Sequence, residues 1–393
     1  MRAPWPEEPP PGPFRPQFWK SPLRGRGLTA LLGSILLALL TIVTVTGFAS
    51  HAAYNPDLGM NAIVPRDDDL GFLTFDWPTS PSWLYAASQG LHVTVGFIAI
   101  PVLLAKLWSV IPRLFEWPPA ASPAQAVERA GLALLVGSAL FLFATGVANA
   151  QLYYPFRFNF VQAHYFAAIV FVASLALHVT IKAPTIRRAY RERGAIKRIE
   201  DDLAAVAPDP PTMSRRGLLG LVGGAGALLA VFVGGQAAGG PFRQLGLFAP
   251  RRASFPVNKT ARSAGVTPAM TGDGWRLAVG DREYTRDELL AMPQRTESLP
   301  IACVEGWSTT QSWTGIPLSA LGRGQCFVES LQPRGVLREA TLSPDQVADE
   351  RSLLALKVNG ADLSLDHGYP ARIIVPALPG VHNTKWVRSL RFS

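Results

Sequence analysis

Five long apolar stretches dominate the first 240 residues and limit what this chain can fold into. Each is near the 20 residues that an α-helix needs to cross about 30 Å of hydrocarbon. The low share of charged residues, 17%, also suits a chain that is partly embedded in a membrane. The sequence therefore predicts five membrane-spanning helices, at Leu28–Ala49, Leu84–Val110, Ala130–Ala150, Phe160–Ile181 and Gly217–Gly235.

Basic residues divide unevenly between the two ends of these helices. The loop after the first helix has Arg66 against five aspartates. Basic residues gather instead in the tail before the first helix and in the loop before the fifth. The positive-inside rule then places the N-terminus in the cytoplasm and everything after about residue 240 outside. We read the net charge of +9 as topological and expect membrane lipid, and no nucleic acid, as a partner.

The segments between and after the helices define the expected fold class, a multi-domain membrane protein. An all-α four-helix transmembrane bundle and a fifth anchoring helix precede an α+β, mostly β domain, in which short apolar runs alternate with Gly/Pro turns. Strands are expected at Trp275–Val279, Leu299–Val304, Leu353–Val358 and Arg372–Val375. The predicted parts are a cytoplasmic tail (1–27), the bundle (28–190), a cytoplasmic linker (191–216), the fifth helix (217–240) and an extracytoplasmic domain (241–393).

Four of the six histidines lie in or beside the predicted helices: His51, His92, His164 and His178. A polar ring inside lipid is costly, so each is a candidate functional group. His164 and His178 are 14 residues apart, which places them on one helix face about 21 Å apart. His92 falls in the outer half of its helix, as His164 does. We therefore expect axial ligation of one haem b by His92 and His164, with a second haem possible at His178.

Two features leave this assignment open. His51 ends the first helix on the outer side and is an alternative ligand, and hydrogen bonding between helices is the alternative role for all four rings. The segments LHVTVG (Leu91–Gly96) and ALHVTIK (Ala176–Lys182) resemble bacterial b-type cytochromes of the cytochrome b561 and formate-dehydrogenase gamma-subunit kind. This resemblance implies electron transport with a quinone or quinol as partner.

The fifth apolar stretch opens with MSRRGLLG (Met213–Gly220), which resembles a twin-arginine export signal. Two ordinary positive-inside arginines are the alternative reading. A twin-arginine signal implies export of an already folded domain that acquires its cofactor in the cytoplasm. Because no A-x-A cleavage site follows, we expect this helix to remain as an anchor in a bacterial inner membrane.

The segment LPIACVEGWSTTQSWTGIPLSAL (Leu299–Leu321) carries the chemistry of the soluble domain. A β-like run delivers Cys303 to a loop beside Glu305, and a thiolate is a soft ligand suited to a redox metal. A buried free cysteine is one alternative. A Cys303–Cys326 disulfide, natural in an exported protein, is the other.

CVEGWS and WTGIPL within this segment resemble the molybdenum-cofactor domain of the sulfite oxidase superfamily. The similarity is greatest to the catalytic subunit of periplasmic protein-methionine-sulfoxide reductase. DHGYPARIIVPALPGVHNTKWVRSLRF (Asp366–Phe392) resembles a second block of that family, and WRLAVGDREYTRDELLAMP (Trp275–Pro293) fits its first strand and helix. The resemblance implies Mo-molybdopterin as cofactor, with Cys303 as the molybdenum ligand and Glu305 close to the metal.

The resemblance also implies residues for the pterin. Lys385, with Arg372 and Arg388, is suited to the pterin phosphate, because phosphate requires fixed cations. His382 is a candidate contact to substrate or cofactor, with a surface loop as its alternative, and His367 reads as a turn residue. Part of the pocket is expected from Arg251–Thr267.

One departure from the sulfite oxidases bears on the substrate. Their anion-binding arginines just after the cysteine are replaced here by Glu305–Ser308. We therefore expect a membrane-anchored molybdenum enzyme that reduces a small-molecule or protein sulfoxide by oxygen-atom transfer. The alternatives are a sulfite-type oxidase that feeds electrons to the membrane, and a non-catalytic receptor with a cofactor-free outer domain.

Overall fold

The computed structural model describes residues 6–55, 62–64, 75–120, 122–191, 208–251 and 253–393. Contacts between Cα atoms divide the chain into two units, Met1–Thr44 with Val95–Val231 and Val45–Thr94 with Phe232–Ser393. The first unit is helical, and the second combines the β-rich C-terminal part with the adjoining ends of three helices. Most of the predicted linker 191–216 lies outside the described residues.

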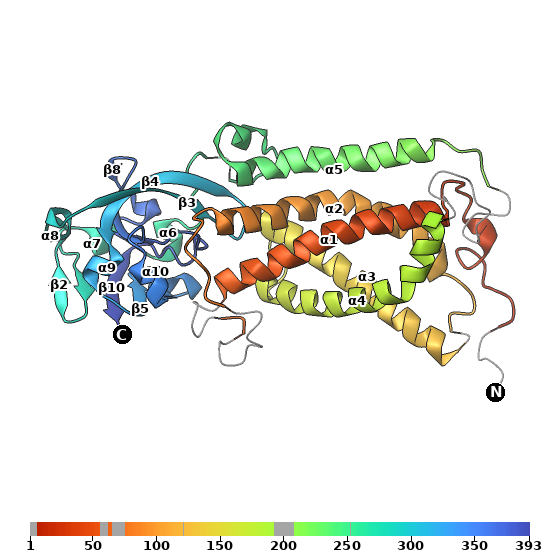
Figure 1. Ribbon diagram of the computed structural model, residues 1–393, viewed down its shortest axis with the longest axis horizontal. Coiled ribbons are helices and arrows are strands. Elements are labelled where there is room, and N and C mark those ends of the chain that lie inside the picture. Colours follow the sequence, from red (N-terminus) through yellow and green to blue (C-terminus); the bar gives the residue numbers. More distant parts are fainter. Residues whose placement is uncertain (1–5, 56–61, 65–74, 121, 192–207, 252) are drawn as a thin grey trace. The chain divides into compact units, whose positions relative to one another are not determined.

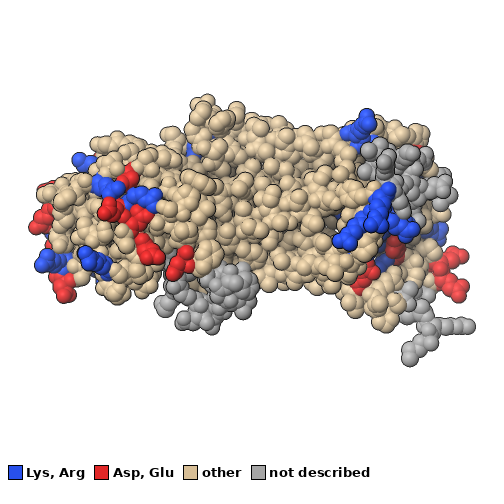
Figure 2. All heavy atoms as spheres, viewed as in Figure 1, with Lys and Arg blue, Asp and Glu red and all other residues tan. Residues whose placement is uncertain are grey.

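Within the described residues, five helices are long and apolar enough to cross a membrane (Figure 1). They confirm the five predicted apolar segments, while their insertion into a membrane stays a prediction. On the face drawn in Figure 2, charged side chains are scarce along the middle of the helices. The bounds are α1 Arg26–Tyr54, α2 Leu84–Leu114, α3 Pro123–Ala150, α4 Phe160–Arg191 and α5 Arg215–Ala238.

The core of the first unit is an interhelical cluster of leucine, valine, alanine and phenylalanine. All five helices contribute to it, with Leu32, Val102, Leu135 and Phe171 among its buried members and Leu218 packed against them. The described start of α3 is set by Ser122, whose side chain accepts a hydrogen bond from the Gln125 amide, a common helix N-cap. Apolar side chains at helical spacing thus account for this unit.

The second unit contains two five-stranded sheets. One has the order β2-β1-β10-β5-β6, and the other has the order β3-β4-β7-β8, with β9 also paired to β7. These sheets confirm the β-rich C-terminal domain. The strands are β1 Leu277–Val279, β2 Arg282–Tyr284, β3 Arg295–Ala302, β4 Ser308–Pro317, β5 Cys326–Ser330, β6 Glu339–Leu342, β7 Leu353–Val358, β8 Ala361–Asp362, β9 Arg372–Ile374 and β10 Val387–Phe392.

Short helices connect the strands and close the sheets. The α-helices are α6 Ala261–Ala264, α7 Pro268–Thr271, α8 Arg286–Ala291, α9 Leu318–Leu321 and α10 Pro344–Ala348. The 3-10 helices are η1 Pro16–Phe18, η4 Gly240–Leu245, η5 Val336–Arg338 and η6 Leu365–His367. The start of α8 is fixed by a capping box between Thr285 and Glu288.

The core of the second unit extends from the sheets to the helix ends. Ala53 of α1 and Tyr85 of α2 are buried in the same apolar cluster as Leu354 and Ile373. Trp77, which precedes α2, belongs to this cluster and donates through its indole N–H to the Ala377 carbonyl oxygen at 2.8 Å. The ends of α1 and α2 are therefore part of the folded C-terminal unit.

Gly315 allows β4 and β7 to approach closely at the point where their register shifts. A methyl group there would lie 2.6 Å from the Ala355 Cα and closer still to the Leu354 carbonyl oxygen. Because both obstacles are backbone atoms, we expect Gly315→Ala to lower the free energy of unfolding by about 2–3 kcal/mol. Thermal unfolding of the purified chain measures this effect. Gly274→Ala, where a methyl group meets nothing within 4 Å, is the control and should have little effect.

Candidate functional site

Cys303 lies in the tight turn between β3 and β4. The two strands pair up to Ala302 opposite Ser308, so five residues form the connection. Within it the Cys303 amide donates to the Trp307 carbonyl oxygen at 2.9 Å, and the Gly306 amide donates to the Cys303 carbonyl oxygen at 3.0 Å. Gly306 has φ +91°, a left-handed conformation that favours glycine. The turn therefore holds the thiol in one fixed position.

The Glu305 carboxylate fixes the same turn from its outer side. Arg251 donates to both carboxylate oxygens, from Nε at 2.6 Å and from Nη2 at 3.1 Å, and the Trp307 indole N–H donates at 2.9 Å. A bidentate arginine pair of this kind is among the strong charge-assisted contacts. This geometry gives Glu305 a positioning role in the Cys303 turn, and its predicted catalytic role stays a prediction.

The thiol of Cys303 is suited to metal binding and poorly suited to acting alone. It is 5% exposed, and burial together with the neighbouring Glu305 charge raises its pKa to about 12. An isolated thiol with that pKa is protonated at neutral pH, whereas coordination to a metal cation displaces the proton. Cys303 and Cys326 are both free thiols, which excludes the predicted disulfide alternative.

Buried cationic groups form a second part of the site. Arg372 is 1% exposed, and among the described residues it donates only to the backbone carbonyl oxygens of His367 and Asn383. Lys385 donates to the carbonyl oxygens of Lys259 and Asp366, each at 2.8 Å. Burial lowers the pKa of Arg372 to about 9 and, with the Arg372 charge, that of Lys385 to about 7. An anion bound here would offset both the desolvation of these two cations and the repulsion between them.

Three buried donors of the same region have no partner among the described residues. They are Nε of Arg372, Nδ2 of Asn383 and Oγ1 of Thr384. His367, whose ring stacks on Phe255 at 3.7 Å, has its pKa lowered to about 4 by burial and by the charges of Arg372 and Lys385. Fixed cations and unused N–H and O–H donors are the groups that a phosphate requires. The residues present therefore fit the phosphate-bearing pterin of a molybdenum cofactor.

The other predicted site residues lie in different surroundings. His382 is fully buried, and its Nε2 lies 2.9 Å from the Tyr54 carbonyl oxygen at the end of α1, so the surface-loop alternative is wrong. Arg388 is exposed on β10, and the structure does not bring it into the buried cationic cluster.

Residues from outside the cysteine motif also reach the turn. Gln89 of α2 donates to the Val304 carbonyl oxygen at 2.6 Å. Buried Arg243, in η4, donates to the Ser308 carbonyl oxygen through Nη2. Sequence reasoning missed both, because neither lies in a motif. It did flag the segment that contains Arg251.

The histidines of the helices are distributed over the two units. In the second unit the His92 ring lies against Gly47, where an added methyl group would come within 2.8 Å of Cε1. His51, one turn beyond Gly47 on α1, is buried. In the first unit the His164 Nδ1 lies 2.9 Å from the Thr145 hydroxyl. This contact joins α3 and α4, which is the alternative role that the sequence left open for the histidines, and the axial role stays a prediction.

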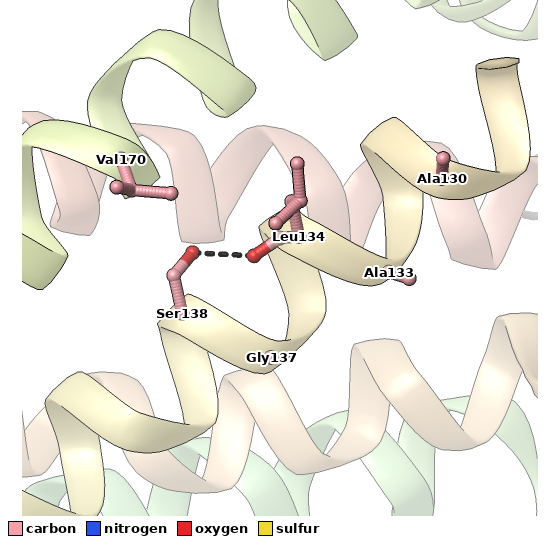
Figure 3. Close-up of a pocket in the computed structure, with 6 residues that line it drawn as sticks. All are labelled: Ala130, Ala133, Leu134, Gly137, Ser138 and Val170. Carbon is pink, nitrogen blue, oxygen red and sulfur yellow. Dashed lines mark hydrogen bonds between the residues drawn. The ribbon is translucent and has the colours of Figure 1, made fainter.

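His178 lies on the same unbroken helix as His164, as its predicted spacing requires. The described residues contain no group of three His, Cys, Asp or Glu side chains placed to hold a metal ion. A groove of about 600 Å³ on α3 and α4 is lined by small and apolar residues (Figure 3), where the Ser138 hydroxyl donates to the Leu134 carbonyl oxygen. Its lining offers no redox or acid–base group.

Comparison with known proteins identifies the C-terminal unit. Residues 264–393 match the family described as "Oxidoreductase molybdopterin binding domain". This part of the chain is similar to molybdopterin-binding oxidoreductase domains. The match contains the Cys303 turn, the buried cations and both sheets, which agrees with the fit of the site to a pterin phosphate.

Three known proteins show sequence similarity to part of this chain. "Putative protein-methionine-sulfoxide reductase subunit YedZ1" of Azospira oryzae is 28% identical over 120 residues, 27% of this chain and 42% of the relative. "Uncharacterized oxidoreductase YuiH" of Bacillus subtilis is 28% identical over 121 residues, which are 27% of this chain and 57% of the relative. "Sulfite oxidase, mitochondrial" of Homo sapiens is 28% identical over 148 residues, which are 31% of this chain and 27% of the relative. The chain thus matches less than two thirds of each relative's length.

Proposed function

We propose that this chain is a membrane-anchored molybdenum oxidoreductase that passes electrons from a quinol and a b-type haem to an extracytoplasmic sulfoxide. The observation that carries the proposal is the buried Cys303 thiol in a molybdopterin-binding domain whose core includes the ends of two apolar helices. In the proposed topology the N-terminus lies in the cytoplasm and the C-terminal domain outside a bacterial inner membrane.

Bound molybdenum supplies two-electron oxygen-atom transfer, in which a sulfoxide takes up two electrons and two protons and leaves as a sulfide and water. The protein's part is to fix and enclose the centre. Cys303 would hold the metal, Arg251 and Glu305 would hold the turn that carries Cys303, and Arg372 and Lys385 would hold the pterin phosphate. The buried turn excludes water, which strengthens each electrostatic contact in the site.

Sulfite oxidation is the second candidate, and Arg243 is the observation that favours it. This arginine is buried beside Ser308, and its Nη1 has no partner among the described residues. Sulfite is a dianion, so the unpaired Nη1 of a guanidinium that contacts Ser308, at the end of the Cys303 turn, would favour it. Turnover of dimethyl sulfoxide and of sulfite by the same purified chain separates the two functions. Sulfite oxidation without sulfoxide reduction would replace the first proposal by the second.

The haem part of the proposal predicts a spectrum. The reduced-minus-oxidised spectrum of the purified protein should show a b-type α band, and His92→Ala or His164→Ala should remove most of it, because each would supply an axial ligand. His367→Ala, in the C-terminal domain, is the control and should leave the band unchanged. Absence of the band in the unchanged protein contradicts the haem, and its persistence in His92→Ala contradicts that ligand.

A further inference from the structure

The start of α2 is hydrogen-bonded to the Cys303 turn and to a segment beside it. Ser82, two residues before α2, accepts a hydrogen bond from the Ala377 amide at 3.1 Å, and Ala377 in turn accepts from the Trp77 indole. Three residues on, the Gly380 amide donates to the carbonyl oxygen of Ala302, next to Cys303. One turn into α2, Gln89 bonds Val304. Hydrogen bonds therefore link the start of α2 directly to Val304, and through the segment 377–380 to Ala302, so that both neighbours of Cys303 are involved.

Tyr85, in that first turn, has a polar group that the protein itself does not use. The residue is 1% exposed, and its hydroxyl oxygen has no hydrogen-bond partner in the described part of the chain. It belongs to the same buried cluster as Ala302, the residue before Cys303. Buried hydroxyls are nearly always paired, so an unpaired one in this cluster indicates a partner that binds there.

The character of this donor indicates what binds. The cationic cluster of Arg372 and Lys385 is the proposed phosphate site, whereas Tyr85 contributes a neutral O–H group in the cluster that contains Ala302. A neutral donor is sufficient for an uncharged acceptor, whereas by itself it does not compensate the charge of a dianion such as sulfite.

We propose that the Tyr85 hydroxyl donates a hydrogen bond to the oxygen atom of an uncharged S-oxide or N-oxide substrate. This inference rests on the proposed function and narrows its substrate class. It makes a residue of an apolar, membrane-type helix a substrate contact of the molybdenum site. An interaction of this kind discriminates between substrates, because a site built for a hydrogen bond binds poorly once one partner is removed.

The test is Tyr85→Phe in the cofactor-loaded full chain. Dimethyl sulfone, which carries the same type of oxygen, is titrated against the Mo(V) electron paramagnetic resonance signal as a binding assay independent of turnover. We expect Tyr85→Phe to weaken sulfone binding about tenfold and to lower kcat/KM for dimethyl sulfoxide by about tenfold or more. Molybdenum content should not change, and the unfolding midpoint should not fall, because the variant removes only an unpaired buried oxygen.

Tyr284→Phe, on β2, removes the same atom elsewhere in the domain and is the matched control. The role of Tyr85 would be overturned if Tyr85→Phe kept both sulfone binding and kcat/KM within twofold of the values for the original protein. It would also be overturned if the original protein did not bind sulfone. Sulfite oxidation without sulfoxide reduction contradicts the proposed function instead, and the sulfone titration still decides the role of Tyr85.

Discussion

Cys303→Ser is expected to yield a folded chain that lacks molybdenum. The buried thiol is surrounded by Glu305 and apolar residues, and only a bound cation makes its thiolate stable there. A serine hydroxyl is a harder and far weaker acid, so it cannot replace the soft ligand. Because loss of an outer-shell partner alone costs roughly 10–100-fold in metal affinity, loss of the ligand itself should cost more. Metal analysis and turnover measure the result.

Cys326→Ser is the matched control. This thiol is also fully buried, and burial raises its pKa to about 12, but it lies on β5 in the other sheet. The substitution should lower stability by about 1–2 kcal/mol and leave the molybdenum content unchanged. If Cys303→Ser kept its molybdenum, or if Cys326→Ser lost it, the assignment of the ligand would be wrong.

Arg372→Met should separate cofactor binding from folding. The guanidinium is fully buried, and its described hydrogen bonds go only to backbone oxygens. In the cofactor-free chain an apolar side chain of similar length removes a desolvation cost, so the unfolding midpoint should stay or rise. In the loaded chain the variant loses a charge-assisted bond to phosphate, and we expect cofactor affinity to fall by about 10²-fold. Arg391→Met, at an exposed residue of the central strand β10, should do neither.

The same cluster predicts how cofactor retention depends on pH. Burial and the Arg372 charge lower the pKa of Lys385 to about 7, and a bound phosphate would raise it. Above pH 7, phosphate binding must then be accompanied by protonation of Lys385. The affinity for the cofactor should therefore fall as pH rises from 7 towards 9. Arg372→Met removes a repelling charge and should weaken this dependence. A retention that increases with pH would contradict the cationic cluster as the phosphate site.

Much of the fold follows from local pattern. Apolar length alone predicts α1 to α5, and alternating apolar runs predict β7 at its observed bounds, Leu353–Val358. The long strand β4 was not predicted, because its sequence is polar and was interpreted only as a motif. Its strand character comes from pairing with β3 and β7, which is a tertiary effect.

The candidate site was predictable only where a motif carries it. Cys303, Arg372 and Lys385 lie in recognisable blocks, and the structure places them in buried surroundings that fit their predicted roles. Tyr85 and Gln89 carry no local signal, since their relation to the Cys303 turn depends on how the start of α2 packs against a sheet more than 200 residues away. Arg243 carries none either, because it meets Ser308 across 65 residues of sequence. The burial of Glu305 against Arg251 likewise required the fold.

The central claim is that electrons pass from the membrane haem to a sulfoxide through the Cys303 site. Its most direct test follows the haem α band of the purified, quinol-reduced full chain after dimethyl sulfoxide is added. We predict that the band is lost on mixing and persists in Cys303→Ser. The claim is contradicted if sulfoxide leaves the band unchanged while sulfite reduces the oxidised haem of the same protein.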